Sequence, residues 1–97
     1  MENERAIVAF EKYKIRRFFD EQKETWYFSV IDIVAALTDS VNPRDYWFKM
    51  KIRVKTEDGI ELSTICRQLK LVSSDGKKYA TDCADVQGLP GIIQSIP

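Results

Sequence analysis

Histidine is absent from the 97-residue sequence, and only two cysteines, Cys66 and Cys83, are present. Without imidazole the chain has no Ser-His-Asp or Cys-His nucleophile system, no histidine general base and no histidine metal ligand. The two thiols lie in apolar periodic segments, where free cysteine packs as a small hydrophobe. We therefore expect both thiols to be reduced, buried and structural, as in a cytoplasmic protein.

Long hydrophobic runs are missing as well. No stretch approaches the roughly 18 apolar residues of a membrane span, and no apolar run of signal-peptide length follows the N-terminus. The sequence has no glycine-rich phosphate loop, no Cys-x-x-Cys pair and no carboxylate pair marked by its spacing. We therefore expect no enzyme activity, no cofactor, no metal and no membrane partner.

What is present is the composition of one small globular domain. Hydrophobic residues make up 44% of the chain and charged residues 31%. Fifteen Lys and Arg balance fifteen Asp and Glu, so the formal net charge is zero. A domain of this length has a modest core, and its composition favours a binding module over an enzyme.

The first part of the chain has the pattern of short strands. Ile7–Phe10 is a short apolar run that reads as a strand. Lys14–Asp20 and Thr25–Phe28 are rich in β-branched and aromatic residues, and the polar segment Glu21–Glu24 between them suits a hairpin loop. We expect a small antiparallel sheet here.

Two helices are predicted next. Ser29 and Asp32 resemble a capping box, and the helix they begin should end near Thr38. Its apolar face is predicted to be Val30, Ile33, Val34 and Leu37. Asn42 as N-cap and Pro43 at the first position begin a second helix, which should end before Gly59. The core face of that helix is predicted to be Trp47, Met50 and Val54.

The remaining segments predict two more helices and a hairpin. A third helix is expected from the spacing of Leu62, Ile65, Cys66 and Leu69. Ser73–Gly76 is expected to turn a hairpin that ends near Ala80, and Thr81-Asp82 to cap a last helix. Gly88–Gly91 should break that helix, with Pro90 opening a second short segment. The predicted fold class is α+β, with small antiparallel strands and hairpins and about four helices.

Although the net charge is zero, two segments of the chain are strongly basic. Residues 42–56 hold five basic residues against the single Asp45, and residues 67–80 hold four against the single Asp75. On a wheel of about 100° per residue, Lys49 and Arg53 lie opposite the predicted core face of the second helix. A second basic ridge lies nearer the edge of that face and consists of Arg44, Lys51 and Lys55.

This layout is typical of a protein that reads duplex DNA, with a helix in the major groove and phosphate contacts beside it. The alternative is an ordinary solvated face, which the near-neutral charge favours. The candidate DNA-binding residues are Arg44, Lys49, Lys51, Arg53, Lys55, Lys70, Lys77 and Lys78.

Several segments resemble one known family in their order and spacing. They are Trp26–Val34, Asn42–Trp47, Leu62–Leu71, Asp75–Lys78, Thr81–Ala84, Gly88–Leu89 and Ile92–Pro97. Together they are similar to the BRO N-terminal domain, which baculovirus BRO proteins share with bacteriophage antirepressors. The resemblance covers nearly the whole chain, but Pro90 and Gly91 stand where relatives carry an aromatic–basic pair.

The resemblance implies a DNA-binding domain of a phage or prophage transcription regulator, located in the cytoplasm of the bacterial host. Residues 1–97 would then be a single domain forming the N-terminal part of a longer protein, which could assemble as a homo-oligomer. The family carries no agreed catalytic residues and no base-contacting residues that can be transferred to this sequence. An alternative is a protein-interaction module that binds a repressor rather than DNA.

Overall fold

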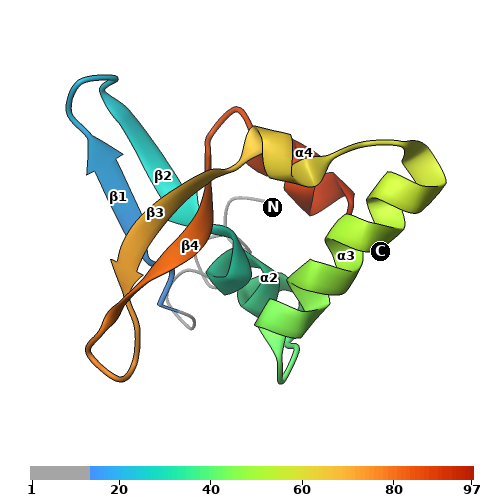
Figure 1. Ribbon diagram of the computed structural model, residues 1–97, viewed down its shortest axis with the longest axis horizontal. Helices are drawn as coiled ribbons and strands as arrows, with labels where there is room; N and C mark the ends of the chain where they lie inside the picture. The colour runs from blue at the N-terminus through green and yellow to red at the C-terminus, as the bar shows by residue number, and fades with distance from the viewer. Residues whose placement is uncertain (1–13) are drawn as a thin grey trace, which may run out of the picture.

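The computed structural model describes residues 14–97, so the strand expected over Ile7–Phe10 lies outside the described residues. The described chain is an α+β fold, as predicted, with a four-stranded antiparallel sheet and three α-helices (Figure 1). The elements follow in the order β1 (Arg17–Asp20), β2 (Thr25–Ser29), α2 (Val30–Thr38), α3 (Pro43–Asp58), the 3-10 turn η1 (Leu62–Ile65), β3 (Arg67–Val72), β4 (Lys78–Asp85) and α4 (Leu89–Gln94).

The sheet has the strand order β1-β2-β4-β3. It is strongly curled, and arginine side chains link its two edge strands, β1 and β3. Arg67 Nη1 on β3 donates to Asp20 Oδ2 on β1 at 2.6 Å, and Arg16 Nη1 before β1 donates to the carbonyl oxygen of Val72 on β3 at 3.1 Å. The sheet is therefore a half-closed barrel. Its inner face holds a small apolar cluster of Tyr27, Leu69, Leu71 and Cys83.

The predicted first hairpin is confirmed, and Ser29 connects it to α2. Ser29 Oγ accepts from the backbone N–H of Asp32 at 3.4 Å, which is half of a capping box. The Asp32 carboxylate does not complete the box, because it accepts instead from Arg16 Nε at 2.8 Å and Nη2 at 3.1 Å. This hydrogen bonding to Asp32 raises the pKa of Arg16. Because Arg16 precedes β1 and contacts both Asp32 on α2 and Val72 on β3, it links these three elements.

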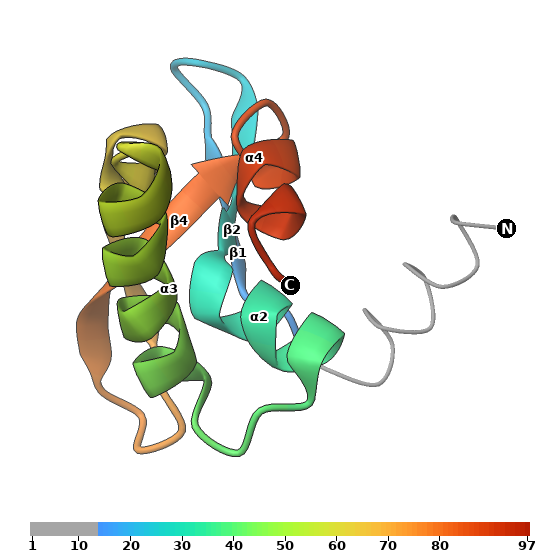
Figure 2. The same cartoon turned by 90° about the vertical axis from the view of Figure 1, so that its right-hand side faces the viewer.

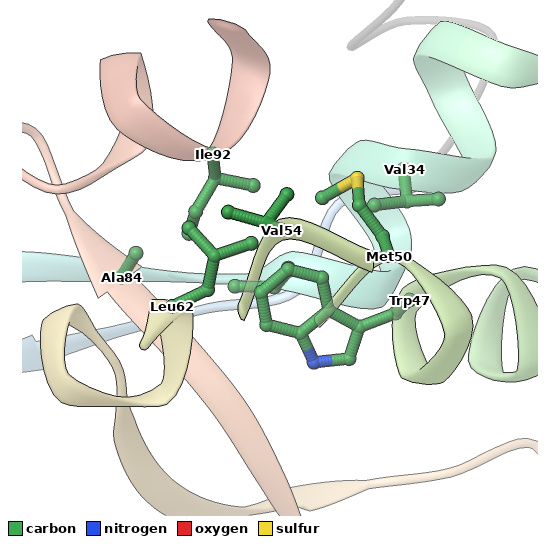
Figure 3. Packing of buried hydrophobic residues seen from close by; sticks show 8 residues of the cluster. Val34, Trp47, Met50, Val54, Leu62, Ala84 and Ile92 are labelled. Atoms are coloured by element: carbon green, nitrogen blue, oxygen red, sulfur yellow. The ribbon is translucent and has the colours of Figure 1, made fainter. Parts of the chain in front are cut away.

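Helix α3 has the boundaries that its capping residues predict. Asn42 accepts from the backbone N–H of Asp45 at 3.2 Å, Pro43 lies in the first turn, and Gly59 ends the helix with φ 69°. Its core face is confirmed, since three α3 side chains are buried against α2, η1, β4 and α4 (Figure 3). The buried cluster comprises Val30, Val34, Trp47, Met50, Val54, Leu62, Ala84 and Ile92.

The helix predicted from the spacing of Leu62, Ile65, Cys66 and Leu69 is wrong. Only the 3-10 turn η1 forms, and the chain then extends as β3. Leu69 and Leu71 also have the alternating spacing of a strand, which places both on the inner face of the curled sheet. The chain reverses at the Asp75-Gly76 turn, where Gly76 has φ 84°. The two strands then pair from Val72 and Lys78 beside the turn to Arg67 and Cys83 at the far end. This non-local pairing outweighs the local helical pattern.

The helix start predicted at Thr81-Asp82 is also wrong. Both residues lie inside β4, where Thr81 is buried and pairs with Leu69. Pro90 does open a short helix, since it lies in the first turn of α4. Leu37, predicted for the core, is 48% exposed. It lies in the last turn of α2, beyond the buried Val30, Ile33 and Val34.

The thiols of Cys66 and Cys83 are free, as expected. Cys83 is buried and Cys66 is half-buried. Burial raises the pKa of Cys66 to about 12 and that of Cys83 to about 11. Among residues 14–97, no helix has both the length and the apolar character needed to cross a membrane.

Candidate nucleic-acid interface

A polar groove of about 170 Å³ lies between α3 and the β3–β4 hairpin. Arg44, Phe48 and Lys51 line it from α3, and Gln68 and Asp82 line it from the strands. The N-terminal end of α3 and the turn of the β3–β4 hairpin are at the same end of the molecule (Figures 1 and 2). The groove therefore joins the basic side chains of α3 to the two strands that carry the second basic block, although Lys70, Lys77 and Lys78 do not themselves line it.

Asp82 is the central acceptor of this groove. Its Oδ2 accepts from Trp47 Nε1 at 2.8 Å and from Lys51 Nζ at 3.2 Å, and its Oδ1 accepts from Gln68 Nε2 at 3.2 Å. Burial alone would raise the pKa of the Asp82 carboxyl, but these hydrogen bonds and the Lys51 charge outweigh burial and lower it. Asp82 thus holds α3 against the sheet and neutralises one of the predicted DNA-binding residues.

Two of the predicted lysines extend the groove along the sheet. Side chains alternate along a strand, so Gln68 and Lys70 on β3 share a face with Lys78 and Asp82 on β4. That face is the one that α3 covers, because Asp82 contacts Trp47 there. Lys70 and Lys78 lie beyond the covered part and are exposed.

Four of the eight predicted residues have unpaired side-chain charges within residues 14–97. Their side chains take part in no hydrogen bond, ion pair or ring contact with another described residue. All four are exposed. They are Arg44 at the start of α3, Lys70 on β3, Lys77 in the hairpin turn and Lys78 at the start of β4.

The other α3 cations are engaged by the protein itself. Lys55 Nζ lies 3.2 Å from Glu61 at the far end of the helix. Lys49 pairs with Asp45 at 3.1 Å across one helical turn, with both side chains at least half exposed. Arg53 Nη2 donates to the carbonyl oxygen of Ser95 at 2.6 Å and so ties α3 to the end of α4.

Lys49 and Arg53 do not line the polar groove. They border a different hollow of about 490 Å³, with apolar walls from Val41, Met50 and Pro97. The structure therefore divides the predicted α3 cations between two sides of the helix. The polar side, with Arg44 and Lys51, is the one that continues onto the β3–β4 hairpin.

Gln68 and Asp82 are not among the site residues that the sequence predicts, because the helical pattern places both in helices. The alternation of Leu69 and Leu71 was the available signal, since it places Gln68 and Lys70 on the opposite face of a strand. Within the described part of the chain, no group of three or more Cys, Asp or Glu side chains is arranged to hold a metal ion.

A scan of the chain against protein-family models found no match, and searches of curated proteins and of solved structures found none either.

Proposed function

We propose that this domain binds duplex DNA through the groove between α3 and the β3–β4 hairpin, as part of a phage or prophage transcription regulator related to the BRO N-terminal domains. One observation carries the proposal. Arg44 comes from a helix and Lys70, Lys77 and Lys78 from a hairpin, yet all four are exposed and unpaired among the described residues at one end of the molecule.

The separation of charge over the surface supports this proposal. The β1–β2 turn carries Glu21 and Glu24 against the single Lys23, and it is at the opposite end of the sheet from the basic β3–β4 turn (Figure 1). The far end of α3 is also acidic, with Glu57, Asp58 and Glu61. A phosphate backbone would thus be attracted to one end of the domain although its net charge is zero.

The proposal predicts a steep salt dependence. If four side chains each neutralise one phosphate, the slope of log affinity against log salt is about −3.6, so affinity falls about 100-fold between 50 and 200 mM salt. Fluorescence anisotropy with labelled duplexes measures this slope. Undetectable duplex binding even at low salt would refute the proposal.

A matched pair of variants separates a defined interface from a general charge effect. Lys70→Glu with Lys78→Glu should weaken binding at least tenfold, because two phosphate contacts become repulsive. Lys14→Glu with Lys23→Glu makes the same change in net charge at exposed positions outside the groove. Equal losses in the two double variants would contradict the assignment of the groove.

A second candidate function is binding of a repressor protein. Phe48 and Ile52 are 58% and 52% exposed and lie one turn apart on α3, and a protein partner could cover such an apolar pair. This function predicts a complex with the repressor that persists at high salt, whereas phosphate binding does not.

A further inference from the structure

The exposed side of α3 carries an apolar pair that the fold does not use. Phe48 and Ile52 are more than half exposed, whereas Trp47, Met50 and Val54 on the core face are 3–4% exposed. Neither Phe48 nor Ile52 belongs to the buried cluster or packs against it. The pair therefore leaves apolar surface in contact with water, which is unfavourable, and it does not stabilise the core.

Basic side chains lie on both sides of this pair. Arg44 and Lys51 border the polar groove, and Lys49 and Arg53 border the hollow on the other side of the helix. The acidic residue in this stretch, Asp45, is paired with Lys49 at 3.1 Å. The exposed surface of α3 is thus an apolar stripe between two rows of basic side chains. Arg44 is unpaired among the described residues, whereas Lys49, Lys51 and Arg53 have partners in Asp45, Asp82 and Ser95.

The major groove of DNA has the complementary arrangement. It is about 12 Å wide and admits an α-helix, with a phosphate backbone along each side. The thymine methyl is the apolar group on its floor. A protein partner that covered Phe48 and Ile52 would also have to desolvate the flanking cations, whereas a duplex supplies phosphates to both rows.

We propose that α3 enters the major groove and that Phe48 and Ile52 select thymine by contacting its 5-methyl group. This inference rests on the proposed function and adds the base that is read. Four residues of helix rise about 6 Å, close to two base-pair steps. The two selected thymines should therefore lie within about two steps of each other.

Deoxyuridine tests the inference directly, because it lacks only the methyl group of thymine. Duplexes enriched by the full chain from a random library are resynthesised with each enriched thymine replaced in turn by deoxyuridine. Loss of one buried methyl should weaken binding about fourfold at each of two positions. The salt slope should not change, since no phosphate contact is altered.

Variants assign the methyl contacts to their side chains. Phe48→Ala should bind the thymine and deoxyuridine duplexes equally at one position, and Ile52→Ala at the other. Leu37→Ala removes a comparably exposed apolar side chain on α2 and should keep full discrimination. Because Phe48 and Ile52 lie outside the core, thermal unfolding of these variants should match that of the parent chain.

The outcomes separate this inference from the proposed function. Salt-dependent duplex binding that is indifferent to the methyl group, or discrimination that survives both alanine variants, overturns thymine reading and leaves DNA binding in place. Absence of any salt-dependent duplex binding overturns both. Loss of repressor binding in the two alanine variants, with duplex binding unchanged, assigns the stripe to a protein partner and also overturns thymine reading.

Discussion

Replacing Asp82 should lower stability and raise DNA affinity at the same time. Asp82→Ala leaves Trp47 Nε1 without its 2.8 Å acceptor, and Trp47 is 3% exposed although it borders the groove. A buried unsatisfied donor costs about 1–3 kcal/mol. The Lys51–Asp82 pair, with side chains 30% and 13% exposed, adds up to about 1 kcal/mol after screening.

The expected loss for Asp82→Ala is therefore about 1–4 kcal/mol. Asp82→Asn should lose less, about 1 kcal/mol, because its amide oxygen still accepts from Trp47 but without charge assistance. Each kcal/mol corresponds to roughly 4–8 °C in a domain of this size. Urea titration followed by tryptophan fluorescence, together with calorimetry, measures both losses. A change below about 0.5 kcal/mol in Asp82→Ala would refute this account of how α3 is held.

The Asp82→Asn substitution should also strengthen DNA binding. Asp82→Asn releases Lys51 from its counter-charge, so the salt slope should steepen by up to about one unit. Asp85→Asn is the matched control, because Asp85 accepts from the backbone N–H of Gly88 at 2.8 Å and does not line the groove. Parallel changes in both variants would show that total charge, rather than Lys51, controls affinity.

The effect of Asp82 on stability should also depend on pH. The pKa of its carboxyl is lowered in the folded protein, so its contribution is present above the unfolded-state pKa of about 3.9 and disappears as pH falls through the folded value. The stability difference between the parent chain and Asp82→Asn should therefore shrink below about pH 4. A difference that grows under acid would contradict the sign of this shift.

Three further predictions concern the fold. Arg16→Ala should cost about 2–3 kcal/mol in urea titration, because it leaves the partly buried Asp32 carboxylate without its bidentate partner; an unchanged midpoint would exclude this role. Gly59→Ala should cost about 1 kcal/mol, since φ is 69° there and no atom lies near the added Cβ; a neutral effect would show that the helix end relaxes freely. Cys66 and Cys83, with pKa values raised to about 12 and 11, should resist iodoacetamide at about pH 8 in the native protein and react in urea; rapid native labelling would contradict their burial.

The features that sequence predicts well here are local ones. The N-cap Asn42, the following Pro43 and the terminating Gly59 all act within a turn of the residues they affect, so both ends of α3 are correct. The same holds for Ser29 at the start of α2 and for the turn at Gly76. Such signals need no knowledge of the rest of the chain.

The errors fall where local and long-range preferences compete. Residues 62–69 fit a helical period and residues 69–71 fit a strand period, and the sequence alone does not weigh one against the other. The six cross-strand pairs between β3 and β4 decide the matter, together with a second pairing of β4 with β2. The predicted helix cap at Thr81 and Asp82 is wrong for the same reason, since capping residues carry no information about strand-pairing partners.

The sequence by itself determines an α+β domain without histidine chemistry, the ends of its longest helix, and two basic blocks within a neutral chain. Tertiary structure alone decides which of those charges are available. Strand pairing places Lys70 and Lys78 on the face of the sheet that α3 covers. Lys51, Arg53 and Lys55 are instead engaged by Asp82, Ser95 and Glu61. These partners lie up to 42 positions away in the chain. The physical reason is that charge is a property of each residue, whereas its neutralisation depends on which distant residues the fold brings within hydrogen-bonding distance.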